Sequence, residues 1–175
     1  QEITLLLFSE VLTGLPLKKK KVQTPMETCE AEELDREHLP VVIPILRAGL
    51  GMVEGVLRLL PVLRIGMLGF SRDEETLKPT HYYQKLPGIT GKDVILLDPM
   101  LATGGTLVHA IDFLKKRGFT RFKLVVLMAA PEGVKKVHEH HPDVKIYAAA
   151  LDRELSSKGY ILPGLGDAGD RIFGT

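Results

Sequence analysis

The stretch Val94-Ile-Leu-Leu-Asp-Pro-Met-Leu-Ala-Thr-Gly-Gly-Thr106 decides the fold class of this chain. Its first four residues are apolar, which is typical of a buried strand, and the strand ends at Asp98. A short loop of small and hydroxyl residues follows, and the spacing of Val108, Ile111 and Leu114 then predicts an amphipathic helix. Open α/β sheets carry ligand-binding groups at the carboxyl ends of their strands, so Asp98 stands where such a group is expected.

The loop after Asp98 has the features of a phosphate site. Its amides and those of the following helix N-terminus are unpaired donors, and the helix dipole favours an anion there. Gly104 and Gly105 let the backbone approach an anion closely, and Thr103 and Thr106 add hydroxyl donors. The alternative is an ordinary strand-to-helix turn, because many α/β loops contain Gly and Thr without binding a ligand.

The rest of the chain continues the alternation of strands and helices. Apolar runs and helical spacing predict strands at 41–46, 65–70, 81–85, 94–97, 123–128 and 144–149, and helices at 2–13, 52–59, 131–140 and after Thr106. This order predicts an α/β fold with a central parallel sheet and right-handed crossovers. A length of 175 residues suits one domain, which we expect to span residues 1–175.

Three segments do not fit this alternation. The charge run from Lys18 to Lys21 is predicted to be a solvated surface turn, and residues 26–38 a loop or a short exposed strand. Residues 71–76 form a charged loop between two strands, and the region 71–80 is the candidate for a mobile lid. The tail, residues 155–175, is rich in Gly, Pro and Asp and is too irregular for another strand–helix unit.

Composition limits the classes of function. A net charge of +1 gives no global field that would favour nucleic acid or an anionic membrane. The single cysteine, Cys29, excludes a disulfide within the chain and fits a reducing compartment. No apolar run approaches the roughly 20 residues of a membrane span. The sequence opens Gln1-Glu2-Ile3 without Met or a signal peptide, so we expect its natural start to be missing.

Two nucleotide-binding motifs are excluded. Gly164-Leu-Gly166-Asp-Ala-Gly169 matches the dinucleotide fingerprint formally, but only six residues follow it, too few for the long helix and distant acid the fingerprint needs. No Gly-Lys-Ser/Thr follows Gly105, so the loop is not an ATP-type P-loop. A phosphate loop without that lysine indicates a different phosphorylated ligand.

Several charged residues are candidates for ligand contacts. Arg47 and Arg72 stand at the ends of predicted strands, and a planar guanidinium binds phosphate oxygens well, although a surface ion pair is the alternative for each. Asp167 and Asp170 flank Gly169, where short carboxylates either cap backbone turns or face a ligand.

Two further clusters suggest metal binding only weakly. Asp73, Glu74 and Glu75 could be Mg²⁺ or substrate ligands, but a solvated loop is the simpler interpretation. His138, His140 and His141 do not share one helix face, so no metal site is expected there.

Six segments, in order, resemble the signatures of the uracil phosphoribosyltransferase family. They are Pro44-Ile-Leu-Arg-Ala-Gly-Leu-Gly-Met52, Arg72-Asp-Glu-Glu-Thr76, Tyr82-Tyr-Gln-Lys-Leu-Pro87, Asp98-Pro-Met-Leu-Ala-Thr-Gly-Gly-Thr106, Ala130-Pro-Glu-Gly133 and Tyr160-Ile-Leu-Pro-Gly-Leu-Gly-Asp-Ala-Gly-Asp170. The match covers nearly the whole chain. It departs where Thr106 replaces the more usual Ser, and it is loose over residues 2–13 and 26–38. Asp98-Pro99 stands where many phosphoribosyltransferases have two acids, and the uracil branch shares this proline.

The resemblance implies a type I phosphoribosyltransferase core with a small hood, a β-arm expected at 65–85, and the conversion of uracil and 5-phosphoribosyl 1-diphosphate (PRPP) to UMP and diphosphate. It implies that the loop binds PRPP through Asp98, Pro99, Met100, Leu101, Ala102, Thr103, Gly104, Gly105 and Thr106. Arg47 and Arg72 would contact the diphosphate, and Asp167 would also face PRPP. Asp167 and Arg72 are the expected catalytic residues. Uracil would be received by Ile161, Gly166, Asp167 and Ala168.

The resemblance also implies Mg²⁺ held mainly by the diphosphate, a homodimer or larger homo-oligomer, activation by a nucleotide such as GTP in parts of the family, and a cytoplasmic role in pyrimidine salvage. Two other functions stay open at the level of sequence. One is a PRPP-binding regulator that has lost turnover, and the other is a phosphoribosyltransferase for another base.

Overall fold

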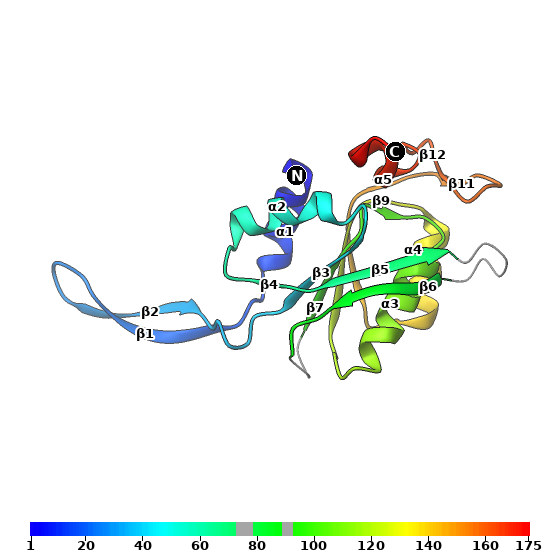
Figure 1. The fold of residues 1–175 in the computed structure, drawn as a ribbon. Helices are drawn as coiled ribbons and strands as arrows, with labels where there is room; N and C mark the ends of the chain where they lie inside the picture. The colour runs from blue at the N-terminus through cyan, green and yellow to red at the C-terminus, as the bar shows by residue number, and fades with distance from the viewer. Residues whose placement is uncertain (73–78, 89–92) are drawn as a thin grey trace.

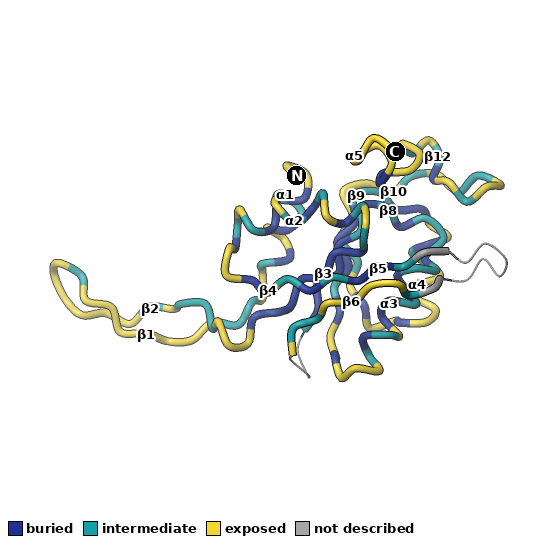
Figure 2. Tube along the Cα trace, viewed as in Figure 1, coloured by how far each residue is buried: buried dark blue, intermediate teal, exposed yellow. Residues whose placement is uncertain are grey.

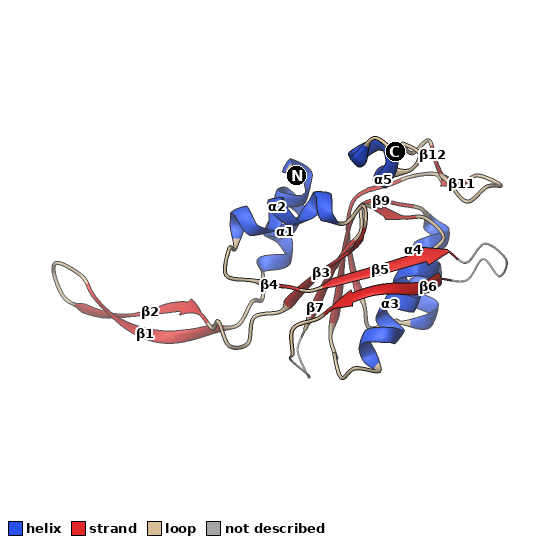
Figure 3. Cartoon of the chain, viewed as in Figure 1, coloured by secondary structure: helices blue, strands red, loops and turns tan. Residues whose placement is uncertain are grey.

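The computed structural model describes residues 1–72, 79–88 and 93–175, with the backbone alone at residues 71, 72, 79 and 80. Figure 1 shows a central twisted sheet with helices on both faces and a two-stranded arm that projects from one end. Figure 3 gives the same view by secondary structure. None of the described helices is long and apolar enough to cross a membrane.

The central sheet confirms the predicted α/β class. Its main path has the order β10-β9-β7-β3-β5-β6. These strands are β10 (Lys145–Leu151), β9 (Phe122–Ala129), β7 (Val94–Leu97), β3 (Val41–Leu46), β5 (Met67–Arg72) and β6 (Pro79–Lys85). All neighbours on this path are parallel except β5 and β6, which pair antiparallel. Two short strands, β4 (Arg64–Ile65) and β8 (Met100–Leu101), pair with β3 and β9.

Helices cover both faces of this sheet. On one face lie α1 (Glu2–Leu12) and α2 (Leu50–Leu59), and on the other lie α3 (Gly105–Lys115) and α4 (Pro131–His140). Successive strand residues therefore enter different cores, because side chains alternate across a sheet. Val41 and Ile43 pack on the α3–α4 side and Val42 on the α1–α2 side. Figure 2 shows the resulting buried centre, and the burial of β3 and β7 confirms that these two strands are covered on both faces.

The projecting arm corrects two predictions. Residues 18–21 are solvated as expected, but they lie in strand β1 (Leu17–Gln23) rather than in a turn. β1 pairs antiparallel with β2 (Thr28–Leu34), and opposite charges face each other across the pair, as in the 2.7 Å contact from Lys20 Nζ to Glu33 Oε2. Strands β5 and β6, expected to form the arm, are instead the edge of the central sheet, because β5 pairs with β3.

The tail folds over the carboxyl ends of the central strands (Figure 1). It contains two two-residue strands, β11 (Glu154–Leu155) and β12 (Ile161–Leu162), and the six-residue helix α5 (Ala168–Phe173). β11 and β12 form a separate antiparallel pair, which we call the tail hairpin. No further strand–helix unit of the central sheet is built from these residues, as predicted.

Candidate active site

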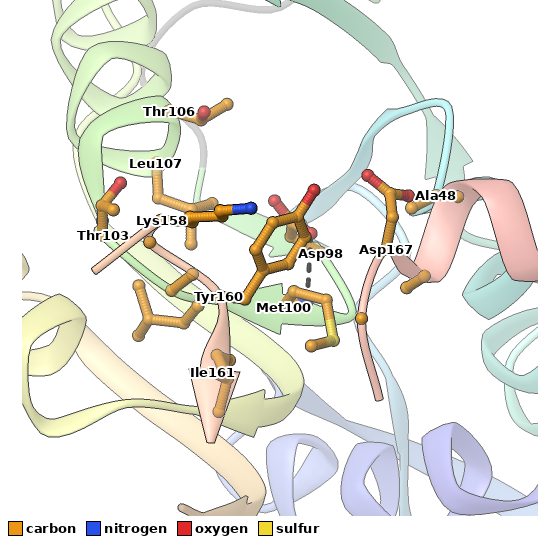
Figure 4. Close-up of a pocket in the computed structure, with 17 residues that line it drawn as sticks. Ala48, Asp98, Met100, Thr103, Thr106, Leu107, Lys158, Tyr160, Ile161 and Asp167 are labelled. Atoms are coloured by element: carbon orange, nitrogen blue, oxygen red, sulfur yellow. Dashed lines mark hydrogen bonds between the residues drawn. The ribbon is translucent and has the colours of Figure 1, made fainter. Parts of the chain in front are cut away.

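A cavity of about 350 Å³ lies between the loop after β7 and the tail (Figure 4). Two segments more than 50 residues apart in the sequence form its walls. The lining residues are Ala48, Asp98, Met100, Leu101, Ala102, Thr103, Gly104, Thr106, Leu107, Lys158, Gly159, Tyr160, Ile161, Gly166, Asp167, Ala168 and Gly169.

The loop of residues 98–106, which the sequence predicts to bind phosphate and which we call the phosphate loop, is held by backbone hydrogen bonds to β9. The carbonyl of Pro99 accepts from the N–H groups of Leu127 and Met128, each at 3.0 Å. Gly104 has a φ of 76°, a left-handed conformation that favours glycine, and it leads directly into α3. No side chain caps the N-terminus of α3, so its first amides remain as donors beside the cavity.

Asp98 is partly buried at the end of β7 and faces the cavity. Desolvation by the surrounding protein raises the pKa of its carboxyl to about 7. The backbone N–H of Met100 donates to Oδ1 at 3.2 Å and opposes this rise in pKa, while the charge of Asp167 adds to it. Two carboxylates therefore share this cavity, and the charge of Asp167 disfavours the ionisation of Asp98.

Asp167 faces the cavity from the tail and also begins helix α5. Its Oδ1 accepts a hydrogen bond from the backbone N–H of Asp170 at 2.9 Å, which makes it the N-cap. Asp152 fixes the tail further, since its Oδ2 accepts from the backbone N–H of Gly164 at 3.0 Å. The turn-capping interpretation of Asp167 is confirmed, and the same residue lines the cavity.

Of the two candidate arginines, the structure describes the side chain of Arg47 but not that of Arg72. Arg47 follows β3 and is absent from the cavity lining. Its Nη2 donates to Asp170 Oδ1 at 3.0 Å and its Nη1 to Thr175 Oγ1 at 3.1 Å. Arg72 ends β5, but its side chain lies outside the described residues, as do Asp73, Glu74, Glu75 and most of the proposed lid.

The structure brings most of the predicted site residues together. All residues predicted to receive uracil, and all predicted loop residues except Pro99 and Gly105, line this one cavity. Six lining residues were not predicted: Ala48, Leu107, Lys158, Gly159, Tyr160 and Gly169. Each lies beside a residue that was predicted or inside a quoted signature, except Lys158 and Gly159, for which the sequence carries no signal beyond proximity to Tyr160.

Two other possibilities for a site are less favoured. A cavity of about 540 Å³ lies at the opposite edge of the sheet, lined by residues such as Val94 and Phe122 at the starts of strands. Ligands of open α/β sheets bind at the other edge, where the strands end. Within the described residues, no group of three or more His, Cys, Asp or Glu side chains could hold a metal ion, and His141 is buried near Asp112.

Comparison with solved structures places the fold in a class. A purine phosphoribosyltransferase from Pyrococcus horikoshii has a TM-score of 0.52 at 22% identity, over 67% of this chain and 78% of that one. This likeness shows the fold, which is that of the type I phosphoribosyltransferases. The AQ2163 protein from Aquifex aeolicus has a TM-score of 0.90 at 44% identity, over 98% of this chain and 82% of that one.

The sequence comparisons identify the family within this class. The family model described as uracil phosphoribosyltransferase matches residues 1–175. A uracil phosphoribosyltransferase from Lacticaseibacillus paracasei is 57% identical, over 99% of this chain and 83% of that protein. One from Bacillus licheniformis is 53% identical with the same coverage. The chain belongs to the uracil phosphoribosyltransferase family.

Proposed function

We propose that this chain converts uracil and PRPP to UMP and diphosphate through the cavity between the phosphate loop and the tail. The bond between ribose C1 and the diphosphate oxygen breaks, a bond from C1 to uracil N1 forms, and the N1 proton is released. The observation that carries the proposal is that family signatures far apart in the sequence line one cavity at the carboxyl ends of the strands.

The phosphate loop is proposed to hold the ribose 5-phosphate. The uncapped amides at the start of α3 and the hydroxyls of Thr103 and Thr106 support this, because both are hydrogen-bond donors. Figure 4 shows the two threonines on the same side of the cavity. Asp98 lies at the other end of the loop, where its carboxyl would accept from ribose hydroxyls. The loop anchors the phosphate, while the bond that breaks lies at the ribose carbon.

The tail is proposed to receive uracil. Ile161, Gly166, Asp167 and Ala168 face the loop across the cavity, and the backbone there offers donors and acceptors that match the alternating carbonyl and N–H groups of uracil. A site that pairs one hydrogen-bond pattern rejects cytosine, because cytosine would leave buried polar groups unpaired. Exclusion of water by the closed site would protect PRPP from hydrolysis.

Departure of diphosphate leaves an oxocarbenium-like centre at C1, as in glycoside cleavage. The protein then needs to orient the base and neutralise the leaving group. We assign the diphosphate contacts to Arg47 and Arg72 and the catalytic roles to Arg72 and Asp167. Asp167 is supported by its place in the cavity, and Arg47 by the position of its guanidinium beside the same tail turn.

Mg²⁺ is the proposed cofactor, held mainly through the diphosphate of PRPP. The carboxylates of Asp98 and Asp167 are hard oxygen donors of the kind Mg²⁺ accepts, and their number is too small for a dedicated cage of protein ligands. When bound, the ion would withdraw charge from the departing diphosphate.

We also propose a homodimer or larger homo-oligomer. The arm supports this proposal. β1 and β2 pair with each other over their full length, but most of their residues are exposed. An isolated two-stranded hairpin is marginally stable, so contact with a second subunit would stabilise the arm. Activation by GTP is proposed from the family resemblance. A cytoplasmic location is supported by the free, exposed Cys29.

Incubation with PRPP, Mg²⁺ and labelled uracil tests the proposed activity. UMP is the expected product, and its absence under conditions where a related enzyme works would contradict the proposal. Calorimetric binding of PRPP without UMP would instead indicate a regulator. Competition among uracil, cytosine and hypoxanthine would reveal another preferred base. Sizing of the protein tests the oligomer, and the rate of UMP formation with and without GTP tests the effector.

A further inference from the structure

Glu132 makes a hydrogen bond that joins helix α4 to the tail hairpin. The residue lies in the first turn of α4, and its Oε1 accepts from the backbone N–H of Leu155 in β11 at 2.9 Å. The two residues are 23 positions apart in the chain, so this bond is a tertiary link and no part of helix capping. A carboxylate acceptor makes such a bond stronger than one between neutral groups.

The tail hairpin carries one wall of the proposed uracil site. Lys158, Gly159, Tyr160 and Ile161 all line the cavity, and Figure 4 shows the Tyr160 ring standing inside it. The pairing of β11 with β12 consists of only two residue pairs, together with bonds around Ser156 in the turn. So short a hairpin needs support from the body of the protein to keep one position.

The same turn of α4 is packed tightly against the phosphate loop. A Cβ on Gly133 would lie 2.2 Å from the carbonyl oxygen of Ala102, so the helix backbone and the loop touch directly there. The backbone N–H of Ala130, which precedes α4, donates to the carbonyl of Leu101 at 2.9 Å. The first turn of α4 therefore contacts the phosphate side of the cavity through its backbone and the base side through Glu132.

We propose that Glu132 is a positioning residue that holds the tail hairpin at a fixed distance from the phosphate loop, and so sets the fit of uracil beside the ribose. Its side chain does not line the cavity and acts through Leu155. The proposal rests on the function proposed above.

Two substitutions separate this role from a general effect of charge on the helix. Glu132→Gln keeps an oxygen acceptor and loses the charge, whereas Glu132→Met keeps the length and loses both. Both remove the favourable interaction of the carboxylate with the helix N-terminus, so only the hydrogen bond distinguishes them. Glu139→Met is the matched control, because Glu139 is an exposed carboxylate of the same helix and pairs with Lys135 at 3.8 Å.

Steady-state kinetics gives the functional readout. We expect Glu132→Met to raise the KM for uracil about fivefold, the scale of one lost hydrogen bond, with a smaller change in the KM for PRPP. Glu132→Gln should stay within about twofold of the native protein and Glu139→Met should match it. An unchanged KM for uracil in Glu132→Met, or equal defects in the Gln and Met variants, would overturn the proposal.

Hydrogen exchange gives a readout that does not depend on activity. The Leu155 amide should exchange faster in Glu132→Met than in Glu132→Gln, and the increase should extend over residues 154–162. Equal exchange in all variants would overturn the link. If the native protein makes no UMP, the proposed function fails, whereas normal turnover with no effect of Glu132→Met removes only the positioning role.

Discussion

Arg47 Nη2 donates to Asp170 Oδ1 at 3.0 Å, a contact that joins the turn after β3 to helix α5 across 123 residues of sequence. Both side chains are about half exposed, so the pair itself contributes little to the free energy of unfolding. Its consequence is geometric. The guanidinium is held beside the turn that carries Asp167.

Arg47→Lys should therefore weaken PRPP binding while the fold is kept. Lysine retains the charge but loses the planar fork that binds two oxygens at once. We expect the KM for PRPP to rise about tenfold, with a smaller change for uracil. Arg58→Lys, at a surface pair with Glu2, is the control. An unaltered KM for PRPP would show that Arg47 serves only to tie the tail.

Asp167→Asn should keep the fold and lose most of the activity. Asn is as good an N-cap as Asp, so the bond from the Asp170 amide survives, while the charge facing the cavity is lost. Asp167→Ala should lose the activity and about 1 kcal/mol of stability as well. Urea unfolding and turnover measured on both variants check this, and normal turnover of the Asn variant would remove Asp167 from the site.

Asp98 should make the protein less stable as the pH rises from about 4 to about 7. Its pKa in the folded protein is about 7, above the ordinary value of 3.8, so the folded state binds more protons than the unfolded state in that window. The stabilising contribution is thus present at low pH and is lost as Asp98 ionises.

Unfolding in urea at pH 5 and pH 7.5 measures this dependence. From pH 5 to pH 7.5, the free energy of unfolding should fall more for the native protein than for the Asp98→Asn variant. The Asn side chain cannot ionise but still offers an acceptor to the backbone N–H of Met100. Glu139→Gln should follow the native protein, because Glu139 is exposed. Parallel pH dependence in the native protein and Asp98→Asn would contradict the raised pKa.

Gly133→Ala should disturb the phosphate loop. The new Cβ would meet the carbonyl oxygens of Ala102 and Leu101 at 2.2 and 2.9 Å, and backbone atoms cannot move aside as a flexible side chain would. We expect a loss of about 1–3 kcal/mol in stability and a raised KM for PRPP. Gly88→Ala is the control, since its Cβ would meet nothing within 4 Å. A Gly133→Ala protein with native melting and native KM would refute the close contact.

Much of the fold was predictable because the signals are local. The apolar run Val41–Leu46 predicted a strand buried on both faces, and the structure confirms it with one core on each side. Helix 131–140 was predicted with its observed bounds, since Pro131 marks its first turn. The strand from Leu17 to Gln23 was missed because it forms by pairing with β2, and a run of lysines alone has no strand pattern.

The segments that form the site were predictable from the sequence, but the contacts between these segments were less so. The six signatures indicated the loop and the tail separately, and the structure places both on one cavity. Lys158 was missed because nothing in its neighbours distinguishes it from any solvated turn residue. The hydrogen bond between Glu132 and Leu155 was also missed, because the two residues are 23 positions apart and no periodic pattern in the sequence indicates such a contact.

The sequence by itself determined the α/β class and the family, because hydrophobic periodicity and motif spacing are properties of neighbouring residues. Only the tertiary structure decided that Asp98 and Asp167 share a cavity, that Arg47 is held by Asp170, and that α4 contacts both walls of the site. The physical reason is the order of the strands. The sheet brings the ends of β3 and β7 together and the tail folds across them, so groups distant in sequence meet at one edge.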